Sequence, residues 1–195
     1  MMTDDAERQR PEARFPELRD HLLDHAVRTG EFTLKSGRKS NWFIDAKATT
    51  CAPAGMLLVA DALLATIPQD VTALGGLTMG ADAAAFATAG IAATRGRMLR
   101  AFSVRKETKD HGGGGRIAGA LFPGDRVAVT EDAVTRGVSM LEAAEQIREA
   151  GAEPVLLVPV VDRGGTVTAM AAAEGLEVRA LVTAPELGFP FEGGT

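Results

Sequence analysis

The residues best suited to chemistry lie in one stretch, V-A-V-T-E-D-A-V-T-R-G-V-S, which spans residues 127–139. This stretch places two adjacent carboxylates, Glu131 and Asp132, directly after a short apolar run that predicts a strand. Because burying two neighbouring acids without partners is costly, we expect both side chains to be exposed at the end of that strand. There they can accept hydrogen bonds from sugar hydroxyls or hold a magnesium ion through water.

The loop behind the two acids contains Thr135, Gly137 and Ser139 and leads into a predicted helix. Backbone N–H groups, hydroxyls and a helix N-terminus together suit a phosphate monoester. One sugar phosphate can therefore be held at both ends. Ser139 also has a reading that needs no ligand, because S-M-L-E at residues 139–142 fits a helix capping box.

The composition is that of an ordinary folded domain. The chain has 195 residues, of which 46% are hydrophobic and 24% charged, and this favours one domain with its own core. No stretch approaches the roughly 18 to 20 apolar residues of a membrane helix, and the polar start is unlike a secretory signal. The only cysteine, Cys51, cannot form an intrachain disulfide, so we expect a cytoplasmic protein with no membrane partner.

The net charge of −5 argues against a nucleic-acid partner, because such proteins usually need a basic field to displace counterions. One segment differs from the rest. Residues 95–116 hold seven basic residues against two acids, so this segment carries +5 and the remainder −10. A basic segment in an acidic protein suggests a concentrated anionic ligand, with a solvated charged loop as the alternative.

These residues must be positioned by a fold in which strands and helices alternate. Strands are predicted at residues 32–34, 42–44, 71–74, 98–104, 127–130, 155–161 and 178–182. Helices are predicted at residues 15–28, 54–65, 82–92, 139–150 and 166–174. From residue 71 onward this alternation predicts a parallel sheet covered on both faces. In such folds ligands bind at the carboxyl ends of the strands, where the two acids lie.

The acids and the loop behind them resemble the loop that binds phosphoribosyl pyrophosphate (PRPP) in type I phosphoribosyltransferases. Four further segments resemble the orotate phosphoribosyltransferases in the order of that family: F-T-L-K-S-G-R-K-S at 32–40, G-G-L-T-M-G-A-D at 75–82, V-R-K-E-T-K-D-H-G at 104–112 and V-D-R at 161–163. The similarity spans residues 32–163, with a compatible tail to about residue 188.

The resemblance implies an α/β fold of the type I phosphoribosyltransferase class. Its central, mostly parallel sheet is flanked by helices and carries a small N-terminal hood and a flexible catalytic loop. We expect a frayed N-terminus at residues 1–12 and a single domain at 13–195, with the hood at about 13–50 and the core at about 51–190. The implied activity transfers the 5-phosphoribosyl group from PRPP to orotate, giving orotidine 5′-phosphate and pyrophosphate for pyrimidine synthesis.

The resemblance also implies roles for individual residues. The catalytic residues are Lys109 and Asp132, and Asp132 holds Mg²⁺ through water together with PRPP. The implied PRPP-binding residues are Lys35, Arg105, Lys106, Lys109, His111, Glu131, Asp132, Ala133, Val134, Thr135, Arg136, Gly137, Val138 and Ser139. Lys109 and His111 lie on the mobile loop, which reaches into the partner subunit's site and so implies a homodimer.

For the base, the resemblance implies Phe43, Thr135 and Arg163 as the orotate-binding residues. A planar guanidinium suits a ring carboxylate. Trp42, next to Phe43, fits a place beside the ring or in the core equally well.

Three residues depart from the family pattern: Thr130, Ala83 and Arg136. They leave PRPP binding better supported than orotate. Two alternatives therefore stay open: a phosphoribosyltransferase for a different base, and a regulator that binds PRPP without catalysis.

Overall fold

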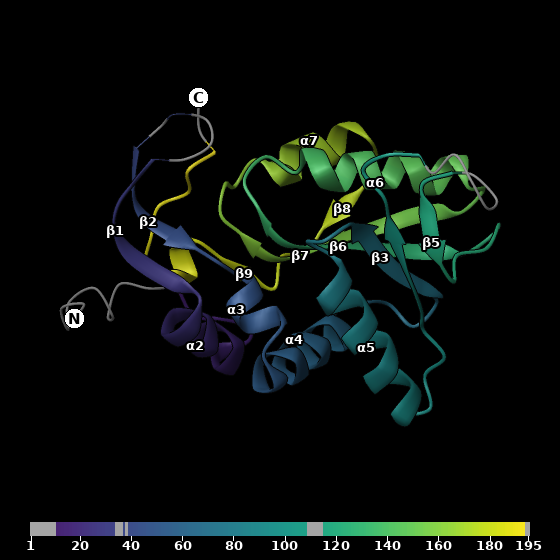
Figure 1. The fold of residues 1–195 in the computed structure, drawn as a ribbon, viewed down its shortest axis with the longest axis horizontal. Helices are drawn as coiled ribbons and strands as arrows, with labels where there is room; N and C mark the ends of the chain where they lie inside the picture. Colours follow the sequence, from purple (N-terminus) through teal and green to yellow (C-terminus); the bar gives the residue numbers. More distant parts are fainter. Residues whose placement is uncertain (1–10, 34–36, 38, 109–114, 194–195) are drawn as a thin grey trace.

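A computed structural model describes residues 11–33, 37, 39–108 and 115–193 (Figure 1). Within this part of the chain, a seven-stranded sheet has the order β5-β4-β3-β6-β7-β8, and β9 also pairs with β7. The strands are β3 (Ala73–Leu77), β4 (Arg100–Val104), β5 (Ile117–Gly119), β6 (Arg126–Val134), β7 (Glu153–Asp162), β8 (Glu177–Val178) and β9 (Val182–Thr183). All neighbours pair in parallel except β4 and β5, which are antiparallel.

Helices cover the sheet on both faces, as Figure 1 shows. On one face lie α4 (Pro53–Thr66) and α5 (Asp82–Thr94), whose buried residues share a core cluster with the sheet. On the other face lie α6 (Val138–Glu149) and α7 (Val167–Ala173), which form a second cluster. A parallel sheet buried on both faces needs apolar strands, and β3 is buried at all five positions.

The N-terminal part of the described chain forms a smaller unit at one end of the sheet. It consists of α2 (Pro16–His25), the antiparallel hairpin of β1 (Val27–Thr33) and β2 (Lys39–Ile44), and α3 (Lys47–Thr50). Leu18 and Leu22 of α2 and Trp42 of β2 are buried in the same cluster as α4. The last helix in the described part is a short 3₁₀ helix, η1 (Pro185–Leu187), and residues 188–193 follow it as a tail without helix or strand.

The alternating pattern from residue 71 onward is confirmed, and two predicted elements are corrected. The helix predicted at 15–28 ends at His25, because Val27 pairs with Ile44 as the first residue of β1. The strand predicted at 178–182 is two short strands, β8 and β9, which pair with different parts of β7. No helix in the described part of the chain is long and apolar enough to cross a membrane.

Candidate active site

The loops that follow four neighbouring parallel strands lie along one edge of the sheet. In order across the sheet these strands are β4, β3, β6 and β7. The loop after β3 is joined to β4 by a hydrogen bond from the Thr78 N–H to the Val104 carbonyl, 2.8 Å. The loop after β7 is joined to β6 by the Arg163 N–H and the Val134 carbonyl, also 2.8 Å. Residues far apart in the sequence therefore meet at this carboxyl edge.

The acid pair lies at the centre of this edge, but it is buried. Glu131 and Asp132 each expose only 8% of their surface, so the expectation of exposed carboxylates is wrong. The reason is that β6 does not end before the acids: Glu131 pairs with Pro159 of β7, and pairing continues to Val134. The strand carries both acids into the sheet, where neighbouring loops cover them.

This burial has a clear electrostatic consequence for Glu131. Burial, followed by the charge of Asp132, raises the pKa of Glu131 to about 8. One of its oxygens, Oε2, has no hydrogen-bond partner in the described structure. A buried acid without full pairing is destabilising unless a ligand supplies the missing partner, so this position is a functional-site candidate on physical grounds.

Asp132 has a partner that the sequence did not identify. The Lys47 ammonium, from α3, forms an ion pair with the Asp132 carboxylate. Burial alone lowers the pKa of Lys47, but the hydrogen bond and charge of Asp132 outweigh this and raise it overall. Asp132 Oδ1 also accepts a hydrogen bond from the Ala133 N–H, 2.9 Å. Lys47 thus pairs the Asp132 carboxylate with a cation, and the Ala133 N–H fixes the direction in which the carboxylate points.

The turn between β3 and α5 packs directly onto the acid pair. At Gly80 an added Cβ would lie 1.4 Å from Glu131 Oε1, so any side chain here would displace the Glu131 carboxylate. Asp82, at the start of α5, holds this turn in place. Its carboxylate accepts hydrogen bonds from Thr78 Oγ1, 2.6 Å, and from Ser103 Oγ of β4, 2.7 Å.

The predicted phosphate loop is the connection from β6 to α6. Gly137 has φ +82°, and a Cβ there would lie 2.6 Å from Val167 Cγ2, so this turn requires glycine. The capping-box interpretation of Ser139 is wrong: the N-cap of α6 is Gly137, no side chain caps the helix, and Glu142 pairs with Arg116. The remaining loop residues Thr135, Arg136 and Val138 are exposed, Ala133 is half-buried and Val134 is buried.

The basic segment at residues 95–116 divides into two groups. Four of its arginines contact other parts of the chain: Arg95 pairs with Asp61, Arg97 donates to Pro68 O, Arg100 pairs with Asp125 and Arg116 pairs with Glu142. Arg105 and Lys106 follow the carboxyl end of β4 and form no ion pair with described residues. The segment as a whole is therefore not an anion site, and only these two described cations remain free to bind a ligand.

Arg163 lies at the other end of the edge, after β7, and is buried with 7% exposed. Its guanidinium donates to the Trp42 carbonyl, 3.0 Å, and stacks over the Trp42 ring at 4.6 Å. Trp42 is fully buried and stacks on Phe189, which confirms its core reading. Phe43 is exposed at 38%, with its ring 5.7 Å from that of Phe32.

Three of the predicted site residues lie outside the described residues: Lys35, Lys109 and His111. The structure brings the other predicted positions to one edge of the sheet and the hairpin beside it. Of these, Ala133 and Val134 belong to β6, and Gly137 is the N-cap of α6.

The chain is similar in sequence to known proteins over most of its length. It is 43% identical over 173 residues to the orotate phosphoribosyltransferase of Corynebacterium glutamicum (strain R), a match that covers 88% of this chain and 92% of that one. The chain belongs to the orotate phosphoribosyltransferase family. No protein-family model matches it.

Solved structures of the family have the same fold. The orotate phosphoribosyltransferase of Mycobacterium tuberculosis H37Rv, in complex with Fe(III) dicitrate, matches with a TM-score of 0.78 and 35% identity, covering 89% of this chain and 98% of that chain. The structure of that enzyme with PRPP matches with a TM-score of 0.74 and 32% identity, covering 89% and 98%. Family membership confirms the predicted resemblance, the fold class and the enzyme class.

The family expectation of Mg²⁺ can be tested against the donors present. The described residues contain no group of three or more His, Cys, Asp or Glu side chains that could hold a metal ion. Mg²⁺ is commonly held by one or two carboxylates together with substrate phosphates and water. Asp132, with the unpartnered Glu131 Oε2 beside it, fits this arrangement and not a site made by protein alone.

Sequence reasoning missed two residues at the site, Lys47 and Glu192. Lys47 lies in a four-residue helix with no motif. Glu192 lies in the tail after η1, and its carboxylate forms an ion pair with Arg163, 2.6 Å. Neither residue belongs to a recognisable sequence motif, because only the tertiary fold brings Lys47 to Asp132 and Glu192 to Arg163.

Proposed function

We propose that this chain transfers the 5-phosphoribosyl group from PRPP to orotate, forming orotidine 5′-phosphate and pyrophosphate. The observation that carries this proposal is the order of charged groups along the carboxyl edge of the sheet. Arg105 and Lys106 follow β4, the acid pair lies on β6 and Arg163 follows β7. Relatives named as orotate phosphoribosyltransferases, and the related structure with PRPP, support the same activity.

The order of these groups matches the order of groups in the two substrates. Neighbouring strands lie about 4.8 Å apart, so β4 and β7 are separated by roughly 14 Å across three spacings. Cations at one end suit pyrophosphate, acids in the middle suit ribose hydroxyls, and a guanidinium at the other end suits the orotate carboxylate. The N-terminus of α6, beside the acids, suits the 5′-phosphate.

The reaction breaks the bond from ribose C1 to the pyrophosphate oxygen and forms a bond from C1 to a ring nitrogen of orotate, which loses its proton. Negative charge develops on the departing pyrophosphate, and fixed cations stabilise it most effectively where water is excluded. Arg105 and Lys106 are placed for this role. Asp132 and Glu131 orient the ribose, and Arg163 orients the base.

When bound, Mg²⁺ supplies positive charge that neutralises the pyrophosphate oxygens. Asp132 is the residue that holds it, through water and together with PRPP. In the described structure the Lys47 ammonium forms an ion pair with this Asp132 carboxylate. We infer that Lys47 holds the Asp132 carboxylate in position until substrate arrives.

A direct assay tests the activity. Protein, Mg²⁺, PRPP and orotate are mixed, and the ultraviolet band of orotate and the release of pyrophosphate are followed together. Loss of the orotate band with release of pyrophosphate is the expected result. Turnover only with a different base would instead favour another phosphoribosyltransferase. PRPP binding without turnover of any base would favour a regulator.

We further propose a homodimer in which the loop carrying Lys109 acts in the partner subunit's site. Lys109→Ala should lower turnover by about 10²- to 10⁴-fold with no loss of thermal stability. Arg95→Ala is the matched control, because Arg95 pairs with Asp61 on the surface and should leave turnover unchanged.

Mixing variants tests the shared site. If Lys109 acts across the dimer, then Lys109→Ala and Asp132→Asn subunits should form mixed dimers with one intact site, restoring up to roughly a quarter of the activity. Sedimentation measures the dimer itself. A monomer, or a mixture no more active than its components, would contradict the shared site and leave the activity proposal standing.

We also propose a cytoplasmic location. The support is the single cysteine, Cys51, which forms no disulfide within the chain. Cell fractionation with an antibody against the protein would test this directly, and recovery outside the cytoplasmic fraction would contradict it.

A further inference from the structure

The tail after η1 folds back over the carboxyl edge of the sheet. Phe189 stacks on Trp42 with ring centroids 4.4 Å apart and an interplanar angle of 5°. The Glu192 N–H donates to the Arg163 carbonyl, 3.0 Å, and the Gly193 N–H donates to the Gly164 carbonyl, 3.0 Å. The tail is therefore fixed at three points, two on the loop after β7 and one on β2.

This path delivers the Glu192 carboxylate to the Arg163 guanidinium. Glu192 Oε2 lies 2.6 Å from Arg163 Nη2, and Oε1 accepts a hydrogen bond from Ser40 Oγ of β2. Both side chains of the ion pair are nearly buried, at 9% and 11% exposed. A carboxylate thus lies on the guanidinium proposed above to bind the carboxylate of the base.

We propose that Glu192 is an internal competitor for Arg163 and weakens the affinity of the enzyme for orotate. This inference rests on the proposed function, since it assigns Arg163 to the orotate carboxylate. With Glu192 in place, an incoming carboxylate meets a guanidinium whose charge is already balanced and a second carboxylate that repels it. Orotate binds fully only when the Glu192 side chain moves away.

The Glu192 side chain can leave Arg163, and orotate can take its place, without unfolding of the tail. Phe189 and the two backbone hydrogen bonds hold the tail independently of the Glu192 side chain. Arg163 also has a further hydrogen-bond donor for a ligand: its Nε is buried and has no partner in the described structure. A guanidinium presents donors in a planar fork, so an incoming carboxylate has Nε available as well as the position that Glu192 leaves.

The size of the effect follows from how often Arg163 is free. If the competent state has a fraction f, the apparent dissociation constant rises by a factor of 1/f. A guanidinium free for about a tenth to a third of the time would raise it roughly 3- to 10-fold. The effect should be confined to the base, because PRPP is held by other residues of the edge.

The test compares wild type with Glu192→Gln in the full chain, with Mg²⁺ present. The amide keeps the shape of the side chain and an oxygen for Ser40, but it removes the charge. The KM for orotate should fall about 3- to 10-fold, and the KM for orotidine 5′-phosphate in the reverse reaction should fall similarly. The KM values for PRPP and pyrophosphate should not change. Glu174→Gln, which removes a surface carboxylate paired with Arg148, is the matched control.

Each outcome separates the inference from the proposed function. An unchanged KM for orotate in Glu192→Gln overturns the inference and leaves the function intact. A raised KM also overturns it, because Glu192 would then orient Arg163 for binding. No turnover of orotate by wild type overturns the proposed function, and the inference with it. A thermal melt of both variants confirms that each is folded during the comparison.

Discussion

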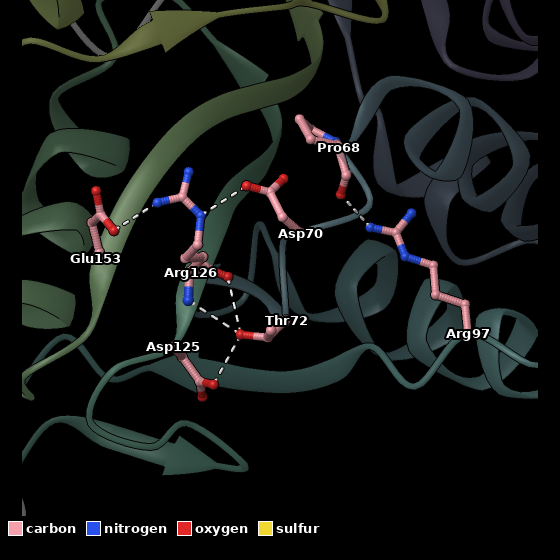
Figure 2. A network of polar contacts seen from close by, with 7 residues as sticks. All are labelled: Pro68, Asp70, Thr72, Arg97, Asp125, Arg126 and Glu153. Atoms are coloured by element: carbon pink, nitrogen blue, oxygen red, sulfur yellow. Dashed lines mark hydrogen bonds and ion pairs between the residues drawn. The ribbon is translucent and has the colours of Figure 1, made fainter.

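The two ends of the sheet both concentrate charged side chains, but they pair them differently. At the amino ends of the strands, each carboxylate of the network in Figure 2 has an arginine. Arg126 contacts Asp70, 2.9 Å, and Glu153, 2.8 Å. Asp125 pairs with Arg100, which the figure does not draw. At the carboxyl ends, two adjacent acids share one lysine, and Glu131 keeps an oxygen without a partner.

The amino-end network joins segments that precede or begin three strands. Thr72 Oγ1, just before β3, donates to Asp125 Oδ1, 2.9 Å, just before β6, and Arg126 N donates back to Thr72 Oγ1, 3.1 Å. Asp125 Oδ2 also accepts from the Phe122 N–H, 2.8 Å. Figure 2 shows Thr72, Asp125 and Arg126 pointing toward one another. Such a network fixes strand register and leaves no acid for a ligand.

The contrast distinguishes a structural cluster from a functional one. Charge pairing at the amino end stabilises the fold with the residues already present. At the carboxyl end burial, followed by the charge of Asp132, raises the pKa of Glu131 to about 8, which destabilises the folded protein at neutral pH. Stability is commonly lower where a site must receive a ligand. Substitutions at the carboxyl end should therefore lower activity more than stability, and substitutions at the amino end should lower stability more than activity.

The largest expected effect is at the carboxyl end. Asp132→Asn should lower kcat/KM for PRPP by about 10²- to 10³-fold, because truncating a hydrogen-bonded charge at a buried site costs about 2 to 5 kcal/mol. The melting temperature should change little, since the Lys47 left behind is partly exposed. Initial rates and calorimetry of PRPP binding measure the two parts. Unaltered PRPP affinity would remove Asp132 from the site.

The matching substitution at the amino end should have the reverse signature. Asp125 is buried and accepts hydrogen bonds from Thr72 Oγ1 and the Phe122 N–H besides its ion pair with Arg100, so Asp125→Asn should cost about 2 to 3 kcal/mol. In a chain of this length that lowers the melting temperature by roughly 5 to 10 °C. Activity per folded molecule should be unchanged. Arg126→Gln is the control, with a loss below about 1 kcal/mol because its ion pairs are exposed.

The third effect concerns Glu131 and depends on pH. Its folded pKa of about 8 lies above the ordinary value of 4.5, so the native state binds more protons than the unfolded state between these values. Stability of the unliganded protein should therefore fall as pH rises from about 5 to 8. Glu131→Gln should flatten this fall and raise the melting temperature at pH 8, because a neutral amide has no charge to desolvate. Thermal melts across this pH range, without ligand, measure it. Parallel curves for the two proteins would contradict the raised pKa.

Much of this site was predictable because its signals are local. Glu131 and Asp132 follow an apolar run, and the glycine and hydroxyl residues after them are contiguous. The burial of the acids was not predictable in the same way. It depends on Pro159 and Val161 of β7 extending β6 through the acids, and on Gly80 packing against them.

The sequence by itself determined the α/β class, the family and the order of the binding segments, because hydrophobic periodicity and contiguous motifs are properties of neighbouring residues. Only the tertiary structure decided which charges are matched. The sequence predicted an anion site that included four arginines which in fact contact other parts of the chain: Arg95, Arg97, Arg100 and Arg116. Lys47 and Glu192 carried no signal, yet they contact Asp132 and Arg163. Ion pairing depends on distance in space, and the partners here lie between about 25 and 85 residues apart along the chain.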